Sequence, residues 1–222
     1  YNMPAHGFFR NMELTPFAIL EDEISFKISD DEETLKLYPY HFEFVVTYKL
    51  EDNKLCVLFD VTNKDEKELL FMIGGHPGFK VPLFDNENYE DYYLKFEEKE
   101  TVDAMQVVDN FLANVYKPCL VNEDKISLRH DIFNPDAIVM RGLKSTYVDL
   151  LSNKNNKSIR FYFKDFEILA VWSLMKENAN FVCLEPWNGI QKEFVADHEK
   201  MGVLSLKAYQ SKQYIYTIEV IN

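Results

Sequence analysis

The sequence contains two side chains whose chemistry and local setting mark them as candidates for a functional site. His76 lies in the segment Gly-Gly-His-Pro-Gly-Phe (74–79), where three glycines permit a sharp turn and let the backbone approach a ligand closely. Glu185 ends the apolar segment Phe-Val-Cys-Leu-Glu (181–185), directly before a proline and a tryptophan. Imidazole and carboxylate groups can exchange protons with a ligand or bind its polar atoms.

Each of the two candidates also has a purely structural interpretation. Alternation along a strand places Phe181, Cys183 and Glu185 on one face. A carboxylate on such an apolar face raises the free energy of the fold unless it is paired or used. Glu185 could instead emerge at the rim of a sheet and cap a turn, and His76 could belong to an ordinary glycine-rich turn. The residues alone leave these alternatives open.

A third segment, His6-Gly-Phe-Phe-Arg10, places an imidazole close to a guanidinium. Together these groups could bind oxyanions or hydroxyls, although so short a combination also arises by chance. Other familiar motifs are absent, since the sequence has no Gly-x-Gly-x-x-Gly, no phosphate-binding Gly-Lys-Ser/Thr loop, no His-Glu-x-x-His and no Gly-x-Ser-x-Gly. Because His6 and His76 are far apart in the sequence, a cupin-like cluster of histidine ligands is not expected, and we predict no metal site.

Composition excludes several classes of function. The 222 residues include 24 Lys and Arg against 37 Asp and Glu, and the net charge of −13 repels phosphate backbones and anionic membrane surfaces. We therefore expect neither a nucleic-acid partner nor a membrane partner. No run of about 18 apolar residues could form a membrane-spanning helix. The three cysteines are widely spaced and odd in number, which argues against a disulfide framework and favours the reducing cytoplasm.

Most of the chain shows the pattern of strands joined by short turns. Two segments rich in aromatic and β-branched residues, 37–50 and 55–62, flank a polar turn at 51–54 and predict a hairpin. The segment 168–174 is apolar on both faces, which predicts a strand in the middle of a packed sheet. Further strands are expected at 69–73, 137–140, 147–151, 159–163, 181–184 and 214–221.

Helical periodicity is scarce, and only 87–93 and 195–200 could form short helices, so an alternating β/α architecture is not expected. Many short strands predict an antiparallel sandwich or barrel. No linker rich in Gly, Pro or Ser divides the chain and no internal repeat is visible, so we predict a single domain over residues 1–222. The sequence begins with Tyr1 rather than with a methionine, and we expect it to start inside a longer protein.

Taken together, three segments resemble the aldose 1-epimerase family of galactose mutarotase-like proteins. They are His6-Gly-Phe-Phe-Arg10, Gly74-Gly-His-Pro-Gly-Phe79 and Cys183-Leu-Glu-Pro-Trp-Asn-Gly189, and their order and separations suit that family. The strand pair at 38–60 and the strand at 169–172 also suit it. The resemblance spans nearly the whole chain, but family members have several strands before its first residues, so we expect a domain truncated at its N-terminus.

The resemblance implies a β-supersandwich, an all-β fold of large antiparallel sheets with few short helices, in which a sugar lies in an open cleft. It implies an aldose 1-epimerase, or mutarotase, that interconverts the α and β anomers of a free hexose. By this resemblance His76 is the general acid, Glu185 is the general base and His6 contacts sugar hydroxyls. Arg10 would contact a hydroxyl or, as in relatives that act on hexose phosphates, a phosphate. Asp136 is the best match to an aspartate that contacts the sugar.

The implied reaction needs only two proton transfers. A base removes the proton of the anomeric hydroxyl while an acid protonates the ring oxygen, the ring opens, the C1–C2 bond rotates, and the ring closes on the other face. A carboxylate and an imidazole suffice, so we expect no cofactor. Trp187, Phe79 or Trp172 could stack on the apolar face of the sugar, with core packing as the alternative, which is favoured more for Trp172 than for Trp187.

Other functions stay open at this point. The enzyme could prefer a hexose 6-phosphate, or the chain could be a carbohydrate-binding protein that kept the fold without turnover. A metal-dependent cupin-like enzyme is a further alternative, which the spacing of the histidines opposes. A matched acid and base favour an epimerase over a binding protein. The expected partner is a small sugar such as galactose or glucose, and the expected state is a cytoplasmic monomer or homodimer.

Overall fold

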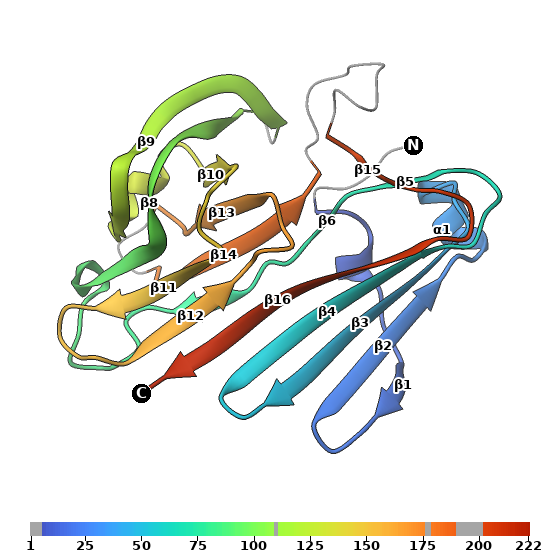
Figure 1. Cartoon of the computed structure of the whole chain (residues 1–222), viewed down its shortest axis with the longest axis horizontal. Helices are drawn as coiled ribbons and strands as arrows, with labels where there is room; N and C mark the ends of the chain where they lie inside the picture. The colour runs from blue at the N-terminus through green and yellow to red at the C-terminus, as the bar shows by residue number, and fades with distance from the viewer. Residues whose placement is uncertain (1–5, 109–110, 176–178, 190–201) are drawn as a thin grey trace. The chain divides into compact units, whose positions relative to one another are not determined.

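The structure is a computed structural model that describes residues 6–108, 111–175, 179–189 and 202–222. Fourteen strands belong to one antiparallel sheet and two more form a small second sheet (Figure 1). Helix within the described ranges is limited to one α-helix and three 3-10 turns. None of these helical segments has the length and apolar character that crossing a membrane requires. The predicted all-β fold of large antiparallel sheets is confirmed.

The chain divides into two compact units, and the first comprises residues 1–71 and 204–215. Its strands follow the order β1-β2-β3-β4-β16, and β5 pairs separately with β15. A 3-10 turn at Phe9–Asn11 precedes these strands. The elements are β1 (Pro16–Ile19), β2 (Glu23–Ser29), α1 (Glu32–Leu37), β3 (Phe42–Glu51), β4 (Lys54–Asn63), β5 (Leu69–Phe71), β15 (Leu204–Leu206) and the first part of β16 (Ser211–Ile221).

The second unit comprises residues 72–203 and 216–222 and follows the order β16-β12-β11-β8-β10-β13-β14-β6, with β7 on β14 and β9 on β8. The prediction of a single domain over 1–222 stays a prediction. The elements are β6 (Ile73–Gly74), β7 (Gly78–Lys80), a 3-10 turn (Tyr89–Asp91), β8 (Tyr92–Val108), β9 (Phe111–Ser127), a 3-10 turn (His130–Phe133), β10 (Ile138–Arg141), β11 (Tyr147–Ser152), β12 (Ser158–Tyr162), β13 (Ile168–Trp172) and β14 (Phe181–Asn188).

The core of the second unit lies where the most apolar segment of the sequence was expected to run through a packed sheet. β13 lies between β10 and β14, and its first four residues, Ile168–Val171, are all 0% exposed. Apolar residues on both faces bury their surface only if both faces are covered. The expectation of a strand in the middle of a packed sheet is therefore confirmed for 168–172, whereas Leu174 lies beyond the strand and is 42% exposed.

The structure corrects the boundaries of the first predicted hairpin. The first strand begins at Phe42 rather than at Leu37. Leu37 is the last residue of α1, a helix capped by the Asp31 side chain, which accepts hydrogen bonds from the backbone N–H groups of Glu33 and Thr34. The hairpin consists of β3 and β4, which pair up to Glu51 and Lys54 and so leave a connection of only two residues.

The largest element that the sequence pattern missed is the hairpin of β8 and β9, two long strands that curve strongly in Figure 1. Its register shifts at several points, starting between Lys95 and Glu100. Such bulges interrupt the alternation on which the recognition of strands depends. Of the two predicted short helices, 87–93 contains the 3-10 turn at Tyr89–Asp91, and 195–200 lies outside the described residues.

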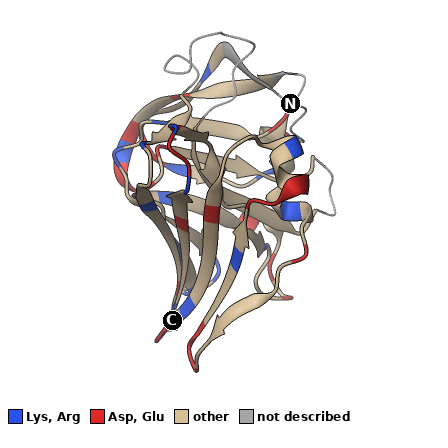
Figure 2. Cartoon of the chain, turned by 90° about the vertical axis from the view of Figure 1, so that its right-hand side faces the viewer, with Lys and Arg blue, Asp and Glu red and all other residues tan. Residues whose placement is uncertain are grey.

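Charges of both signs are interspersed along the strands in the view of Figure 2. Some of them pair across neighbouring strands. Arg160 on β12 lies directly opposite Asp149 on β11, and its Nε is 2.8 Å from Asp149 Oδ1. The guanidinium also lies over the ring of Tyr147, 3.9 Å from its centroid. Pairs of this kind help to fix which residues face each other in an antiparallel ladder.

A buried carboxylate anchors the bulged part of β8. Glu100 is 2% exposed, and its Oε1 accepts hydrogen bonds from the backbone N–H groups of Lys144 and Ser145 and from the Ser145 hydroxyl. Removal of the carboxylate leaves three donors without this acceptor. We expect Glu100→Ala to lower the free energy of unfolding by about 3 kcal/mol, measured by urea denaturation. The exposed Glu98 is the matched control, and Glu98→Ala should change stability by less than about 0.5 kcal/mol. Equal losses in the two variants would contradict this role of Glu100.

Candidate active site

β14 presents Glu185 on one face of the sheet. Cys183 and Trp187 share this face, whereas Val182 and Leu184 point to the opposite face and are 0% exposed. The residue opposite Glu185 on β13 is Ala170. Glu185 thus lies on the predicted face of the strand as a buried carboxyl group, 3% exposed.

The loop that bears His76 is held against β14 by its backbone. The N–H of Gly75 donates to the carbonyl oxygen of Pro186 at 3.1 Å, and the N–H of Leu184 donates to the carbonyl oxygen of Pro77 at 3.2 Å. These two hydrogen bonds lie on either side of His76 along the chain. They fix the loop so that the imidazole lies above Glu185.

The glycines before His76 are required by close packing. A β-carbon at Gly74 would lie 2.8 Å from the carbonyl oxygen of Pro186, and one at Gly75 would lie 2.7 Å from Cε1 of Tyr216. Both distances are shorter than van der Waals contact allows. The sequence suggested that these glycines let the backbone approach a ligand closely. In the structure, they let the loop approach β14 and the ring of Tyr216.

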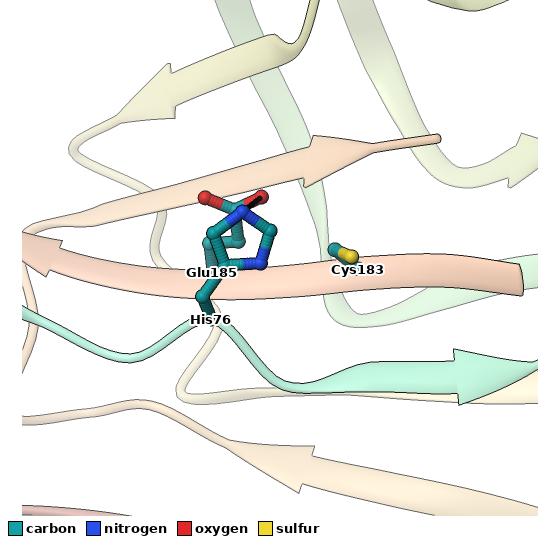
Figure 3. Close-up of side chains that lie close together, drawn as sticks. All are labelled: His76, Cys183 and Glu185. Atoms are coloured by element: carbon teal, nitrogen blue, oxygen red, sulfur yellow. Dashed lines mark ion pairs between the residues drawn. The ribbon is translucent and has the colours of Figure 1, made fainter. Parts of the chain in front are cut away.

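His76 and Glu185 form a direct contact, with 3.2 Å between Nε2 and Oε1 (Figure 3). The His76 side chain is 42% exposed and the Glu185 side chain only 4% exposed. One partner can therefore meet a ligand from solvent while the other lies below it. The predicted convergence of the two side chains is observed, and their roles in proton transfer stay a prediction.

Glu185 has the most perturbed environment in the site. Its pKa is raised to about 8, chiefly by burial and to a smaller extent by the charge of Asp136, while a hydrogen bond from the Trp187 side chain lowers it. Burial has this effect because the charged form of a carboxylate loses its hydration. A carboxyl group with such a pKa can both accept and return a proton near neutral pH, as a general acid or base must.

Two tryptophans contact the pair. Trp172 lies opposite Cys183 in the ladder, and its ring meets the imidazole of His76 edge to face, with centroids 6.0 Å apart and an angle of 83°. Trp187 hydrogen-bonds to Glu185 and packs on an apolar cluster at the same face. Core packing was favoured more for Trp172 than for Trp187, yet Trp172 is half-buried and in contact with His76. The stacking of either ring on a sugar stays a prediction.

Phe79 belongs to the core rather than to the site. It lies opposite Val182 in the ladder of β7 and β14, and Val182 faces away from Glu185. The ring is 7% exposed and packs against Phe161 with centroids 6.1 Å apart. Of the interpretations given for Phe79, core packing is therefore the correct one.

The other predicted site residues are placed differently. Asp136 precedes β10 in the same unit and is near enough for its charge to raise the pKa of Glu185. It also lines a surface cavity of about 380 Å³, to which neither His76 nor Glu185 contributes. His6 and Arg10 belong to the first unit, so their roles toward the sugar stay predictions.

Cys183 is a site residue to which sequence reasoning gave no role. Its side chain lies beside His76 and Glu185, and burial together with the charge of Glu185 raises its pKa to about 12. The thiol therefore keeps its proton at neutral pH and is a poor nucleophile. The alternation Cys-x-Glu on one strand was the signal in the sequence that could have identified it.

Comparisons with known proteins were consistent with this fold. The family model for aldose 1-epimerase matches residues 1–203. Protein LacX of Lactococcus lactis subsp. lactis is 34% identical over 224 residues, an alignment that covers 98% of this chain and 75% of LacX.

Two solved structures from lactobacilli share the architecture. The galactose mutarotase related enzyme from Lactobacillus acidophilus superposes with a TM-score of 0.92 at 32% identity, covering 100% of this chain and 75% of that one. A galactose mutarotase-like protein from Lactobacillus casei superposes with a TM-score of 0.89 at 27% identity, covering 100% and 77%.

The buried carboxyl group predicts a pH-dependent cost in stability. Because the pKa of Glu185 rises from 4.5 to about 8 on folding, the native state holds a proton that the unfolded state releases. The contribution of Glu185 to the free energy of unfolding is fully present below pH 4.5 and decreases as the pH rises toward about 8. We expect Glu185→Gln, which has no charge to bury, to be more stable than the wild type at alkaline pH, by on the order of 2–4 kcal/mol.

Thermal and urea unfolding between about pH 5 and pH 9 measure this difference. Glu98→Gln, at an exposed position of the same unit, is the control and should track the wild type. The difference in free energy of unfolding between Glu185→Gln and the wild type should change with pH. If this difference stays constant over the whole range, the buried carboxyl group does not titrate as described.

Proposed function

This chain belongs to the aldose 1-epimerase family, and we propose that it interconverts the α and β anomers of a free hexose such as galactose or glucose. The observation that carries the proposal is the contact between His76 and Glu185. An imidazole open to solvent and a buried carboxylate, held together by the backbone of one loop and one strand, are suited to act on one small ligand.

In the proposed reaction, the ionised form of Glu185 accepts the proton of the anomeric hydroxyl and the imidazolium of His76 donates a proton to the ring oxygen. The two sugar oxygens are bonded to the same carbon, so an acid and a base at hydrogen-bond distance from each other can reach both. The C1–O5 bond breaks as the C1–O1 bond becomes a carbonyl. The product is the open-chain aldehyde with a hydroxyl at C5.

Rotation about the C1–C2 bond then presents the other face of the aldehyde. His76 takes back the proton of the C5 hydroxyl as its oxygen attacks C1, and Glu185 returns its proton to O1. Each group ends in the protonation state in which it began, so the cycle consumes nothing and needs no cofactor. Each well-placed acid or base of this kind contributes a factor of about 10²–10⁴ in rate.

The sugar is proposed to be unphosphorylated because Asp136, a charged group that acts on Glu185, is acidic. Asp136 acts on Glu185 through its charge, and a phosphate placed nearby would meet the same repulsion. Asp136 and Trp187 are proposed to bind the sugar in the second unit, and the roles of His6 and Arg10 toward the sugar stay predictions. Three free cysteines support a cytoplasmic location, and we propose a monomer or a homodimer.

The test is polarimetry of freshly dissolved α-galactose and α-glucose. The wild-type protein should accelerate the decay of optical rotation in proportion to its concentration. His76→Asn and Glu185→Gln should each lower the catalysed rate by a factor of about 10²–10⁴, because each removes one proton transfer. α-Glucose 6-phosphate assayed in parallel measures the preference for the unphosphorylated sugar.

The control variants carry the same two replacements, His to Asn and Glu to Gln, at positions outside the site. His41→Asn alters an exposed histidine of the first unit that pairs with Asp30, and Glu98→Gln alters an exposed glutamate of β8. Both should retain the wild-type rate. Saturable sugar binding without any acceleration by the wild type would instead identify a carbohydrate-binding protein, and full activity in both site variants would refute the assignment of the acid and base.

A further inference from the structure

A third potential ligand atom lies beside the imidazole and the carboxylate, the sulfur of Cys183. Alternation along β14 puts Cys183 and Glu185 on one face, and the loop before β7 places His76 next to both (Figure 3). The imidazole nitrogen, the sulfur and a carboxylate oxygen all lie within 4.8 Å of one another. The proton-transfer cycle makes no use of the sulfur.

We propose that His76, Cys183 and Glu185 together bind a thiophilic divalent cation such as Zn²⁺. The donors are one nitrogen, one sulfur and one oxygen, a mixed set that suits zinc and cadmium. Magnesium and calcium prefer oxygen ligands alone and are disfavoured by a thiolate. The donor chemistry therefore selects borderline and soft ions over the abundant hard ones.

The geometry fits an ion with three protein ligands. With bonds of about 2.0–2.3 Å in a tetrahedral arrangement, neighbouring donor atoms lie about 3.3–3.6 Å apart. The 3.2 Å between His76 Nε2 and Glu185 Oε1 is close to this separation, and the sulfur needs to approach by about 1 Å from the 4.8 Å limit. Gly78, opposite Cys183 on β7, has no side chain that would resist such a movement.

The ion would enter from the exposed side of His76, and water would complete its coordination there. On binding, the S–H bond of Cys183 breaks, and its proton passes to solvent together with the proton of the Glu185 carboxyl group. The thiolate then forms a bond to the ion. The carboxylate of Glu185 and the neutral imidazole of His76 each donate a lone pair. No group is oxidised or reduced.

Occupancy by the ion would inhibit the epimerase, a consequence that rests on the function proposed above. A metal-bound imidazole cannot carry a proton on Nε2, and a metal-bound carboxylate oxygen cannot accept one from a sugar. The ion and the aldose would therefore compete for the same two side chains. Metal binding itself does not depend on any catalytic activity of the chain.

Absorption of a cadmium–thiolate complex in the ultraviolet tests the site directly. In a Cys56→Ser, Cys119→Ser variant, Cys183 is the one cysteine that remains of three. Titration of this variant with Cd²⁺ should give an absorption band that saturates at one ion per chain. Adding Cys183→Ser should abolish the band, and adding His76→Asn should weaken Cd²⁺ binding by more than about tenfold. Zn²⁺ should displace Cd²⁺, whereas Mg²⁺ should not.

Polarimetry with Zn²⁺ completes the experiment. The zinc concentration for half inhibition should increase by more than about tenfold in Cys183→Ser, with each variant normalised to its own metal-free rate. Cys183→Ala replaces Cys183→Ser if the serine variant does not fold. A band that survives loss of Cys183, or the absence of any band, overturns the metal site. A Cys183-dependent band in a chain without epimerase activity supports the metal site and overturns the proposed function.

Discussion

The contact between His76 and Glu185 depends on the backbone of β14. The two hydrogen bonds that hold the histidine loop to this strand, at Pro186 and at Leu184, lie on either side of Glu185. These backbone hydrogen bonds fix the distance between the main chain at His76 and the main chain at Glu185. The two side chains therefore start from fixed positions. Pre-organisation of this kind keeps reacting groups in place before a ligand arrives.

Burial of the Glu185 carboxyl group lowers the stability of the fold. β13 and β14 are buried on both faces, so the carboxyl group of Glu185 loses its hydration. The hydrogen bond from the indole N–H of Trp187 replaces only part of the lost interaction with water. A fold selected for stability alone would place an apolar side chain opposite Ala170. The retained carboxylate is a local conflict between folding and chemistry, and such conflicts are typical of functional sites.

Sequence reasoning succeeded where a local rule decides the outcome. Alternation along residues 181–185 gave the face of β14, and the apolar run at 168–174 gave the most buried strand. It failed where the local pattern is short or interrupted. α1, capped by Asp31, is too short for periodicity to reveal, and the bulges of β8 and β9 hide two long strands. That Trp172 contacts His76 follows from the pairing of β13, β14 and β7, which no spacing in the sequence specifies.

The order of strands in the second unit has a consequence for how the chain matures during synthesis. β14 pairs with β6 and β7, which precede it by most of the length of this unit, and with β13, its immediate predecessor. A nascent chain that leaves the ribosome therefore exposes the glycine-rich loop long before its partner strand exists. The contact between His76 and Glu185 therefore forms only after β14 has been synthesised. Contacts between residues so far apart in the sequence form slowly.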